Sequence, residues 1–273
     1  MKTITKEIIQ SIFKKRESNS HKGTYGHALL IAGKTSQMGA AIIASKSCLR
    51  SGVGLLTVDI PKEERLILQT ALPEAMLSFR ENYISVENFS AIAIGPGIGC
   101  SSDSLALLKK TLAAHNRPLV IDADGLNLIA QNTDLFHHLP EDTILTPHPK
   151  EFDRLFGDCS NEEERIAIAQ KKAKELRCII VLKGNHTHVI SKDDILVNIL
   201  GNAGLAKGGS GDALTGMILS FLSQGYTPYQ AAQLAVYLHG LAADLTLNRQ
   251  SMESMLITDV IENLGAAFQS LDV

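Results

Sequence analysis

The chain has 273 residues, of which 45% are hydrophobic, and a formal net charge of -3 at pH 7. This length is enough for one large domain or two small ones, with ample core in either case. The small net charge gives no field that would attract nucleic acid or an anionic membrane. No run approaches the ~18 apolar residues of a membrane helix, and residues 1–20 carry scattered charges without an apolar block. We therefore expect no nucleic-acid partner, no membrane attachment and no signal peptide.

The four cysteines are far apart in the sequence and form no CxxC pair; they are Cys48, Cys100, Cys159 and Cys178. This spacing favours buried free thiols in a protein of the reducing cytoplasm over disulfides or a metal site.

Apolar runs of strand length occur at 27–32, 54–60, 91–94, 118–121, 142–146 and 178–182. Segments with apolar residues at helical spacing lie between several of these runs, at 36–50, 102–115 and 161–176. Short apolar strands that alternate with helices predict βαβ units and an α/β fold, in which helices cover both faces of a mostly parallel sheet.

The pattern changes near the C-terminus. Residues 188–199 contain two short apolar runs around a polar turn, which predicts a hairpin added to one edge of the sheet. The rest of the chain reads as helix: one helix runs from Asp212, and a second opens at Thr227-Pro228-Tyr229-Gln230 with the features of a capping box. No linker, repeat or shift in charge divides the chain, so we expect a single domain over 1–273.

Ligands of open parallel sheets bind outside the carboxyl ends of the strands. Five predicted strands are followed there by glycine, polar or ionisable residues: GKTSQMGA (33–40), GPGIG (95–99), DADGLN (122–127), PHPKE (147–151) and KGNHT (183–187). Each stretch alone is typical of a turn. Together they predict a long ligand-binding crevice. Asp122 and Asp124 either bind substrate hydroxyls or cap the next helix, and we favour capping.

Two common nucleotide motifs are absent. Gly33-Lys34-Thr35 resembles the end of a P-loop, but that motif requires glycine where Ala28 stands. The GPGIG stretch would need glycine at 102 to match the dinucleotide fingerprint, and Ser102 is there. A P-loop NTPase and a Rossmann dehydrogenase are therefore excluded.

The stretch KGGSGDALTGM (207–217) places three glycines before Asp212, at the start of an apolar helix. Free N–H groups and the positive end of the helix dipole make such a start an anion site. These amides would stabilise charge on a transferring phosphoryl group, and Asp212 would accept the proton of an attacking hydroxyl. The alternative for Asp212 is a plain helix cap. We favour the catalytic role, because an ordinary cap does not need the preceding glycines.

Seven motifs, in this order along about residues 21–245, resemble those of the ADP-dependent NAD(P)H-hydrate dehydratase family: HKGTYG (21–26), MGAA (38–41), GPGIG, DADGLN, LTPHPKEF (145–152), VLKGNHT (181–187) and GNAGLAKGGSGDALTGM (201–217). The last motif and LTPHPKEF are specific to this family, whereas GxGD alone indicates only the wider ribokinase-like superfamily. The resemblance implies a ribokinase-like fold.

The resemblance also implies a repair reaction, in which (6S)-NADH or NADPH hydrate is phosphorylated on its ring hydroxyl by ADP and then loses phosphate. The products are AMP, phosphate and NAD(P)H, and Mg²⁺ is expected mainly on the nucleotide phosphates. Asp212 would activate the hydroxyl. The hydrate would contact Ala40, Ala41, Gly97, Gly99 and His148. The nucleotide would be held by Lys183, Gly184, Asn185, His186, Thr187, Gly209 and Gly211.

Several assignments have structural alternatives. His148 is either presented to a ligand or satisfied structurally, and Lys183 either pairs with phosphate or only ends a strand. Glu151 either lies near magnesium, through water, or favours the start of a helix. We name no protein ligand for the metal. The resemblance further implies a homotetramer, and many bacterial relatives carry an N-terminal epimerase domain, which we do not expect here.

Two other functions remain open. A ribokinase-like kinase of a vitamin-precursor alcohol would use the same aspartate, but would release a stable phosphate ester. A catalytically silent nucleotide sensor would not need a base at Asp212.

Overall fold

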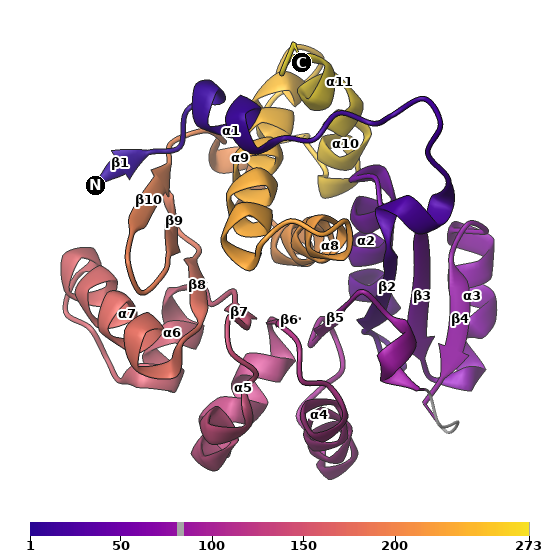
Figure 1. Ribbon diagram of the computed structural model, residues 1–273, viewed down its shortest axis with the longest axis vertical. Coiled ribbons are helices and arrows are strands. Elements are labelled where there is room, and N and C mark those ends of the chain that lie inside the picture. The colour runs from indigo at the N-terminus through magenta and orange to yellow at the C-terminus, as the bar shows by residue number, and fades with distance from the viewer. Residues whose placement is uncertain (81–84, 273) are drawn as a thin grey trace.

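The computed structural model describes residues 1–80 and 85–272, which build a ten-stranded sheet with helices on both faces (Figure 1). In spatial order the strands are β1 (Lys2–Thr3), β10 (Ile195–Asn198), β9 (Thr187–Ile190), β8 (Ile179–Leu182), β7 (Ile144–Leu145), β6 (Leu119–Ile121), β5 (Ala91–Ile94), β2 (His27–Ile31), β3 (Leu55–Ile60) and β4 (Met76–Phe79). Strand β9 is antiparallel to both neighbours, and the other pairs are parallel. The fold is therefore the expected mostly parallel α/β type.

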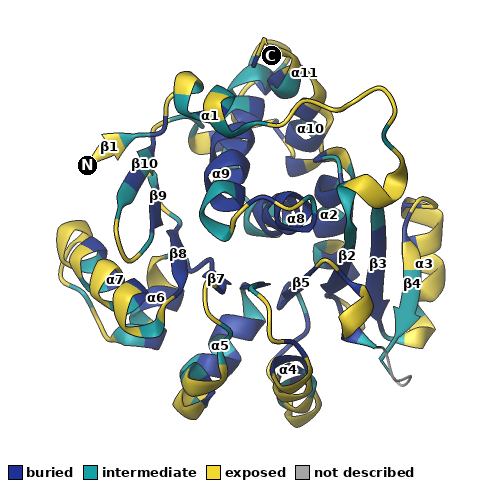
Figure 2. Cartoon of the chain, viewed as in Figure 1, coloured by how far each residue is buried: buried dark blue, intermediate teal, exposed yellow. Residues whose placement is uncertain are grey.

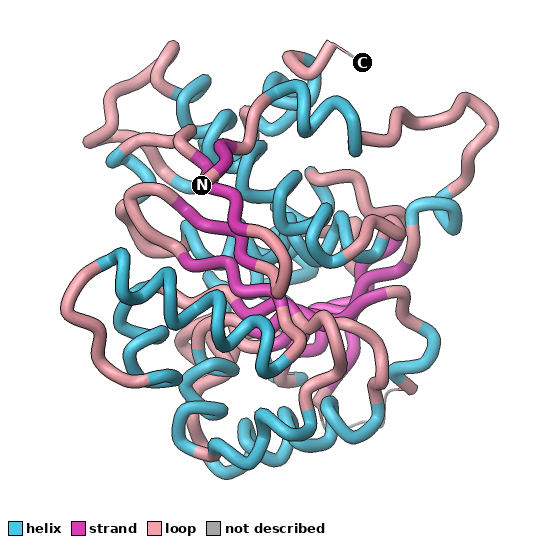
Figure 3. Tube along the Cα trace, turned by 60° about the vertical axis from the view of Figure 1, so that its left-hand side comes forward, coloured by secondary structure: helices cyan, strands magenta, loops and turns pink. Residues whose placement is uncertain are grey.

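Two hydrophobic cores lie on opposite faces of the sheet. Along β2, Ala28 and Leu30 belong to one core and Leu29 and Ile31 to the other, because successive side chains of a strand point to opposite faces. The first core packs against α1 (Lys6–Ile12), α2 (Met38–Arg50), α3 (Arg65–Ala71), α8 (Ser210–Ser223), α9 (Pro228–Thr246), α10 (Ile257–Glu262) and α11 (Leu264–Gln269). The second packs against α4 (Ser102–Ala114), α5 (Asp124–Gln131), α6 (Pro149–Phe156) and α7 (Glu162–Leu176). Figure 3 shows the strands between these two layers of helices.

The six predicted strands and the predicted hairpin are all present, with boundaries shifted by at most two residues. The strand β1 was not expected. It pairs with β10 and so forms the outer edge of the sheet, which means that the hairpin is not itself the edge. The strand β4 was also missed, because its four residues are only partly buried and lack a clear apolar run.

Helices α8 and α9 are the most deeply buried pair of the molecule in Figure 2. The capping box predicted at Thr227 is present: its side chain accepts a hydrogen bond from the Gln230 N–H, and Gln230 reaches back to the Thr227 N–H. No helix among the described residues is both long and apolar enough to span a bilayer.

The prediction of buried thiols is wrong for two of the four cysteines. All four are free, and Cys48 and Cys178 are buried, but Cys159 is half-buried and Cys100 is exposed. Cys100 follows the GPGIG turn at the carboxyl end of β5, which lies at the surface of the crevice rather than in a core. The residue type alone does not show whether a cysteine is buried or exposed.

Candidate active site at the carboxyl edge of the sheet

The start of α8 exposes backbone N–H groups to the crevice. Gly209 is the N-cap and has a φ of +95°, a conformation that side chains rarely adopt. The helical hydrogen bonds begin with Ala213 N–H to Gly209 C=O, at 2.9 Å. The N–H groups of Gly211 and Asp212 precede this bond, so they are available to an anion.

Asp212 is the third residue of α8 and does not cap it, because Gly209 occupies the cap without any side-chain hydrogen bond. The structural alternative for Asp212 is therefore wrong. Burial raises the pKa of the Asp212 carboxyl to about 6, and the nearby Asp122 carboxylate adds to this effect against the opposing charge of Lys183. A carboxylate with this pKa is suited to accept a proton near neutral pH.

Close packing against α2 fixes the position of α8. A side chain at Gly216 would clash with the Ala44 carbonyl oxygen, which would be only 2.0 Å from an added Cβ. The Ser47 hydroxyl donates a hydrogen bond of 2.7 Å to the Ala213 carbonyl. Both contacts lie within one turn of Asp212, so the catalytic candidate stands on a rigid support.

A buried ion pair lies directly beneath the glycines. Lys183 Nζ donates to Asp122 Oδ1 at 2.8 Å, and Asp122 Oδ2 accepts from the Thr215 hydroxyl at 2.7 Å. The ammonium is 3.1 Å from where a Cβ on Gly211 would lie. Burial alone would lower the pKa of Lys183, but the carboxylates of Asp122 and Glu151 outweigh it and raise that pKa. The lysine therefore carries a positive charge beside the free amides of α8.

His148 and Glu151 form a reciprocal cap at the start of α6. His148 Nδ1 accepts from the Lys150 and Glu151 N–H groups, and a Glu151 carboxylate oxygen accepts from the His148 N–H at 2.8 Å. Glu151 is buried and also lies 3.8 Å from Lys183 Nζ. Burial lowers the pKa of His148. Both residues therefore cap the start of α6, which is the structural role that was left open for them. His148 also lines the cavity described next.

A cavity of about 600 Å³ opens beside Lys183 and Gly211. This is within the usual size range of cofactor pockets. Its walls combine the β8–β9 turn, the segment after β10 and the starts of α6 and α8 with the middle of α9. The lining residues include His148, Lys183, Gly184, Asn185, Thr187, Asn198, Gly201, Asn202, Ser210, Gly211, Leu214 and His239.

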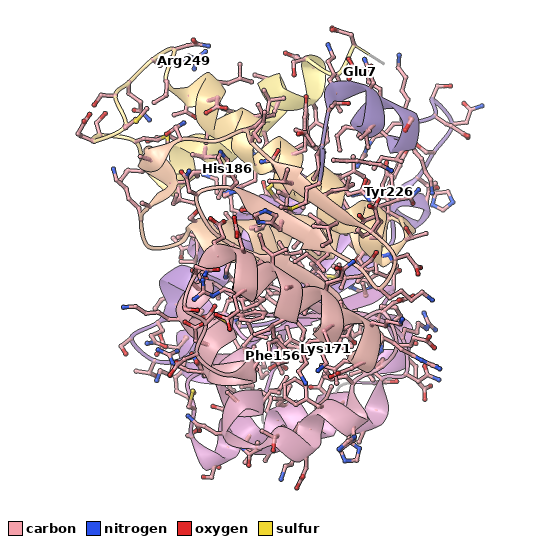
Figure 4. The ribbon with its side chains drawn as sticks, turned by 90° about the vertical axis from the view of Figure 1, so that its left-hand side faces the viewer. Glu7, Phe156, Lys171, His186, Tyr226 and Arg249 are labelled. Carbon is pink, nitrogen blue, oxygen red and sulfur yellow. The ribbon has the colours of Figure 1, made fainter. Side chains whose placement is uncertain are left out.

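Four of the five residues predicted in the β8–β9 turn line this cavity. The exception among the described residues is His186, which is exposed on that turn and labelled in Figure 4. Of the two predicted glycines, Gly211 lines the cavity, whereas Gly209 lies behind it, near Ile43 and Ile257.

Of the residues predicted to hold the hydrate, Ala40, Gly97 and Gly99 lie at the start of α2 and in the GPGIG turn, whereas His148 lines the first cavity. A Cβ on Gly97 would lie 3.0 Å from the Ala40 side chain, so the GPGIG turn packs on the start of α2. The Gly99 N–H donates to Asp124 Oδ2 at 2.7 Å. Ala41 is fully buried beneath Gly33, so its side chain is not part of a ligand surface.

The preference for capping at Asp122 and Asp124 is wrong. The N-cap of α5 is Ala123, which makes no side-chain cap. Asp122 pairs with Lys183, and Asp124 holds the Gly99 turn. Both carboxylates contribute to the raised pKa of Asp212.

Sequence reasoning missed three polar residues. Thr215 anchors Asp122 from one turn along α8, while Asn198 and His239 line the cavity from β10 and α9. Nothing in the GxGD stretch predicts the contact of Thr215 with Asp122, except that Thr215 lies four residues after Gly211 on the same helix. Polar residues within apolar segments are the only sequence cue for Asn198 and His239.

Among the described residues, no group of three His, Cys, Asp or Glu side chains is arranged to hold a metal ion. The carboxylates of Asp122 and Asp124, which act on the pKa of Asp212, already accept hydrogen bonds from other residues of the protein.

The sheet order, the glycine-led start of α8 and the cavity over the strand ends define a ribokinase-like α/β protein. The family model described as NAD(P)H-hydrate dehydratase matches residues 28–265, and the chain belongs to this family. It is 37% identical to the ADP-dependent (S)-NAD(P)H-hydrate dehydratase of Bacillus subtilis strain 168, over 97% of this chain and 98% of that protein.

The fold matches a solved member of the family. The ADP/ATP-dependent NAD(P)H-hydrate dehydratase from Bacillus subtilis, co-crystallised with ATP and Mg²⁺, superposes with a TM-score of 0.88 at 34% identity, covering 99% of this chain and 98% of that one. The bifunctional NAD(P)H-hydrate repair enzyme of Moorella thermoacetica is 33% identical over 98% of this chain. The chain spans 54% of the length of that protein.

Proposed function

We propose that this protein is an ADP-dependent dehydratase of (6S)-NADH and NADPH hydrates. The observation that carries the proposal is the position of Asp212, a carboxylate of raised pKa at the start of α8, beside free amides and the Lys183 ammonium. This arrangement suits phosphoryl transfer, which depends on positioning and on stabilising charge. The family match supplies the substrate class.

The nucleotide is assigned to the cavity beside Lys183. Its phosphates would lie at the N–H groups of Gly211 and Asp212, next to the ammonium. Gly184, Asn185 and Thr187 line the same cavity and would contact the rest of ADP. In this placement the terminal phosphoryl group faces Asp212.

The hydrated ring is assigned to the opposite side of Asp212. Ala40, Gly97 and Gly99 are small residues, two of them in a tight turn, so the ring could lie close to the backbone there. Asp124 braces this turn through Gly99. His148 lines the nucleotide cavity, so we assign its ring to the boundary between the two ligands.

The reaction would then proceed in two stages. Asp212 takes the proton of the ring hydroxyl, and the hydroxyl oxygen attacks the terminal phosphorus of ADP. The bond from that phosphorus to the bridging oxygen breaks, and AMP leaves. The ring carbon–oxygen bond then breaks with its electron pair departing on phosphate, while the lone pair of the ring nitrogen assists. The adjacent carbon gives up a proton to the departing phosphate or to water, and its C–H electron pair restores the double bond. Hydroxide leaves poorly and phosphate leaves readily, which is the reason for the first stage.

The residues of this site fit magnesium carried by the nucleotide phosphates. The described carboxylates are hard oxygen donors but form no cage, and Mg²⁺ retains several waters and commonly shares phosphate oxygens. When bound, the ion would offset the negative charge of the phosphates. Glu151 and Asp124 are the carboxylates that would accept hydrogen bonds from its waters.

One assay tests the proposal. Purified protein is incubated with acid-hydrated NADH, magnesium and either ADP or ATP, and the absorbance of the dihydronicotinamide is followed. We expect recovery with ADP, together with equal amounts of AMP and phosphate. If no absorbance returns with either nucleotide while a small alcohol is phosphorylated, the protein is a kinase instead. Nucleotide binding without turnover of any kind would indicate a sensor.

The remaining expectations extend the same proposal. We assign a homotetrameric assembly, which sedimentation at several protein concentrations would test, and a cytoplasmic location. The assembly stays a prediction from the family resemblance, and the location stays a prediction from the spacing of the cysteines.

A further inference from the structure

A second cavity, of about 450 Å³, lies beyond the GPGIG turn. It is formed by α4 and the segment before it, together with the residue after β4 and the segment after β2. Its lining residues are Lys34, Arg80, Ile98, Ser101, Asp103, Ser104, Ala106, Leu107 and Lys110. None of these residues lines the cavity assigned to ADP.

The lining of this second cavity is rich in positive charge. Among the described residues that line it, three are cations, Lys34, Arg80 and Lys110, and one is a carboxylate, Asp103. Arg80 donates to the carbonyls of Ala32 and Gly33 at 2.7 and 2.6 Å, and pairs with Asp59. Arg80 therefore fixes the backbone from which Lys34 projects, and Lys34 is the group that we consider for a ligand.

The second cavity adjoins the turn assigned to the hydrate ring, because its lining residue Lys34 lies beside Gly99. Lys34 Nζ is 2.8 Å from where a Cβ on Gly99 would lie, and the Gly99 N–H is bonded to Asp124. The Gly33 N–H is in turn bonded to the Pro96 carbonyl at 2.7 Å. The GPGIG turn thus contacts both Asp124 and Lys34.

We propose that the second cavity binds a phosphate group of the hydrated dinucleotide while its ring lies at Asp212. This inference rests on the proposed function and deepens it. Apart from the ring and its ribose, the dinucleotide consists of a diphosphate and an adenosine, and NADPH carries a further 2′-phosphate. Ammonium groups such as Lys34 bind these anions by charge-assisted hydrogen bonds. Serine hydroxyls of Ser101 and Ser104 lie in the same wall.

The test compares Lys34→Met with the wild-type protein. Lys109→Met is the matched control, since Lys109 is exposed on α4 but does not line the cavity. Steady-state kinetics are measured with NADPH hydrate, NADH hydrate and the hydrate of dihydronicotinamide riboside, which carries no phosphate. We expect Lys34→Met to raise the KM of a phosphate-bearing hydrate about tenfold or more, with a much smaller change in kcat. Lys34→Arg should recover most of the loss.

The three substrates distinguish the source of the phosphate. A loss confined to NADPH hydrate assigns the cavity to the 2′-phosphate, and an equal loss for both dinucleotides, much larger than for the riboside, assigns it to the diphosphate. Equal losses for all three substrates, or losses no larger than those of Lys109→Met, would overturn the inference. Failure of the proposed function looks different, because the wild-type protein would then turn over none of the hydrates.

Discussion

Lys183 Nζ lies 2.8 Å from Asp122 Oδ1, which joins the carboxyl ends of β8 and β6 beneath the first turn of α8. The pair is nearly enclosed: the side chain of Asp122 is 1% exposed and that of Lys183 is 17% exposed. The strands at the two ends of this contact are separated by β7. The ion pair therefore both holds the floor of the site together and fixes a positive charge next to Gly211.

Removal of this cation should affect both stability and nucleotide binding. In Lys183→Met, Asp122 and Glu151 lose their buried partner, so we expect the free energy of unfolding to fall by about 3 kcal/mol. The dissociation constant for ADP should rise by tenfold or more. Urea denaturation and calorimetric titration measure the two effects. Lys192→Met, in the exposed turn between β9 and β10, should change neither, and unaltered ADP binding in Lys183→Met would exclude the assigned phosphate position.

The glycines of the KGGSGD stretch should differ in their tolerance of a methyl group. In Gly211→Ala the new Cβ would lie 3.1 Å from Lys183 Nζ, which displaces the ammonium and narrows the phosphate position. We expect kcat/KM for ADP to fall by about tenfold or more, while the melting temperature changes little. Gly208→Ala is the matched control, because nothing lies within 4 Å of its added Cβ. If kcat/KM for ADP fell by a comparable factor in both variants, displacement of Lys183 would not explain the loss in Gly211→Ala.

The activity should depend on the ionisation of Asp212. A base must be deprotonated to act, and burial together with Asp122 raises the pKa of Asp212 to about 6. We therefore expect kcat/KM to be level above pH 7 and to fall about tenfold per pH unit well below pH 6. A profile in the wild-type protein that stays level down to pH 5 would argue against a carboxylate base with this environment.

The same raised pKa has a cost in stability. The folded protein holds a proton on Asp212 more tightly than the unfolded chain does, so the contribution of this group weakens as pH rises from about 4 to about 6. Asp212→Asn removes the buried charge. We expect its melting temperature to exceed that of the wild-type protein at pH 8, with a smaller difference at pH 4. Thermal unfolding followed by circular dichroism at both pH values measures this, and a variant that is less stable at pH 8 would contradict it.

Much of the fold is legible in the sequence because the strands are short, apolar and buried on both faces. The runs that became β2, β5 and β8 are of this kind, and the polar stretches after them do meet at one edge of the sheet. Strand β1 has only two residues, and its partner β10 lies far away in the sequence. No local sequence pattern therefore predicts it.

The site was only partly predictable for a related reason. The glycines and Asp212 stand out in the sequence because an ordinary helix start does not need several glycines before an acidic residue. The role of Asp122, in contrast, depends on Lys183, which is 61 residues away. Thr215 is an ordinary helical residue until the fold brings it to Asp122. Local propensity therefore suggested a helix cap at Asp122, where tertiary contact made an ion pair.

The most direct test of Asp212 as the base is a pair of measurements on Asp212→Ala, with Asp193→Ala in the exposed β9–β10 turn as the control. ADP affinity is measured by calorimetry, and repair of hydrated NADH by the return of absorbance. We expect ADP binding within a few-fold of the wild-type value and turnover reduced by at least about a hundredfold, because loss of a positioned base removes its share of the rate. Repair at the wild-type rate would show that another group takes the proton and that Asp212 is not catalytic.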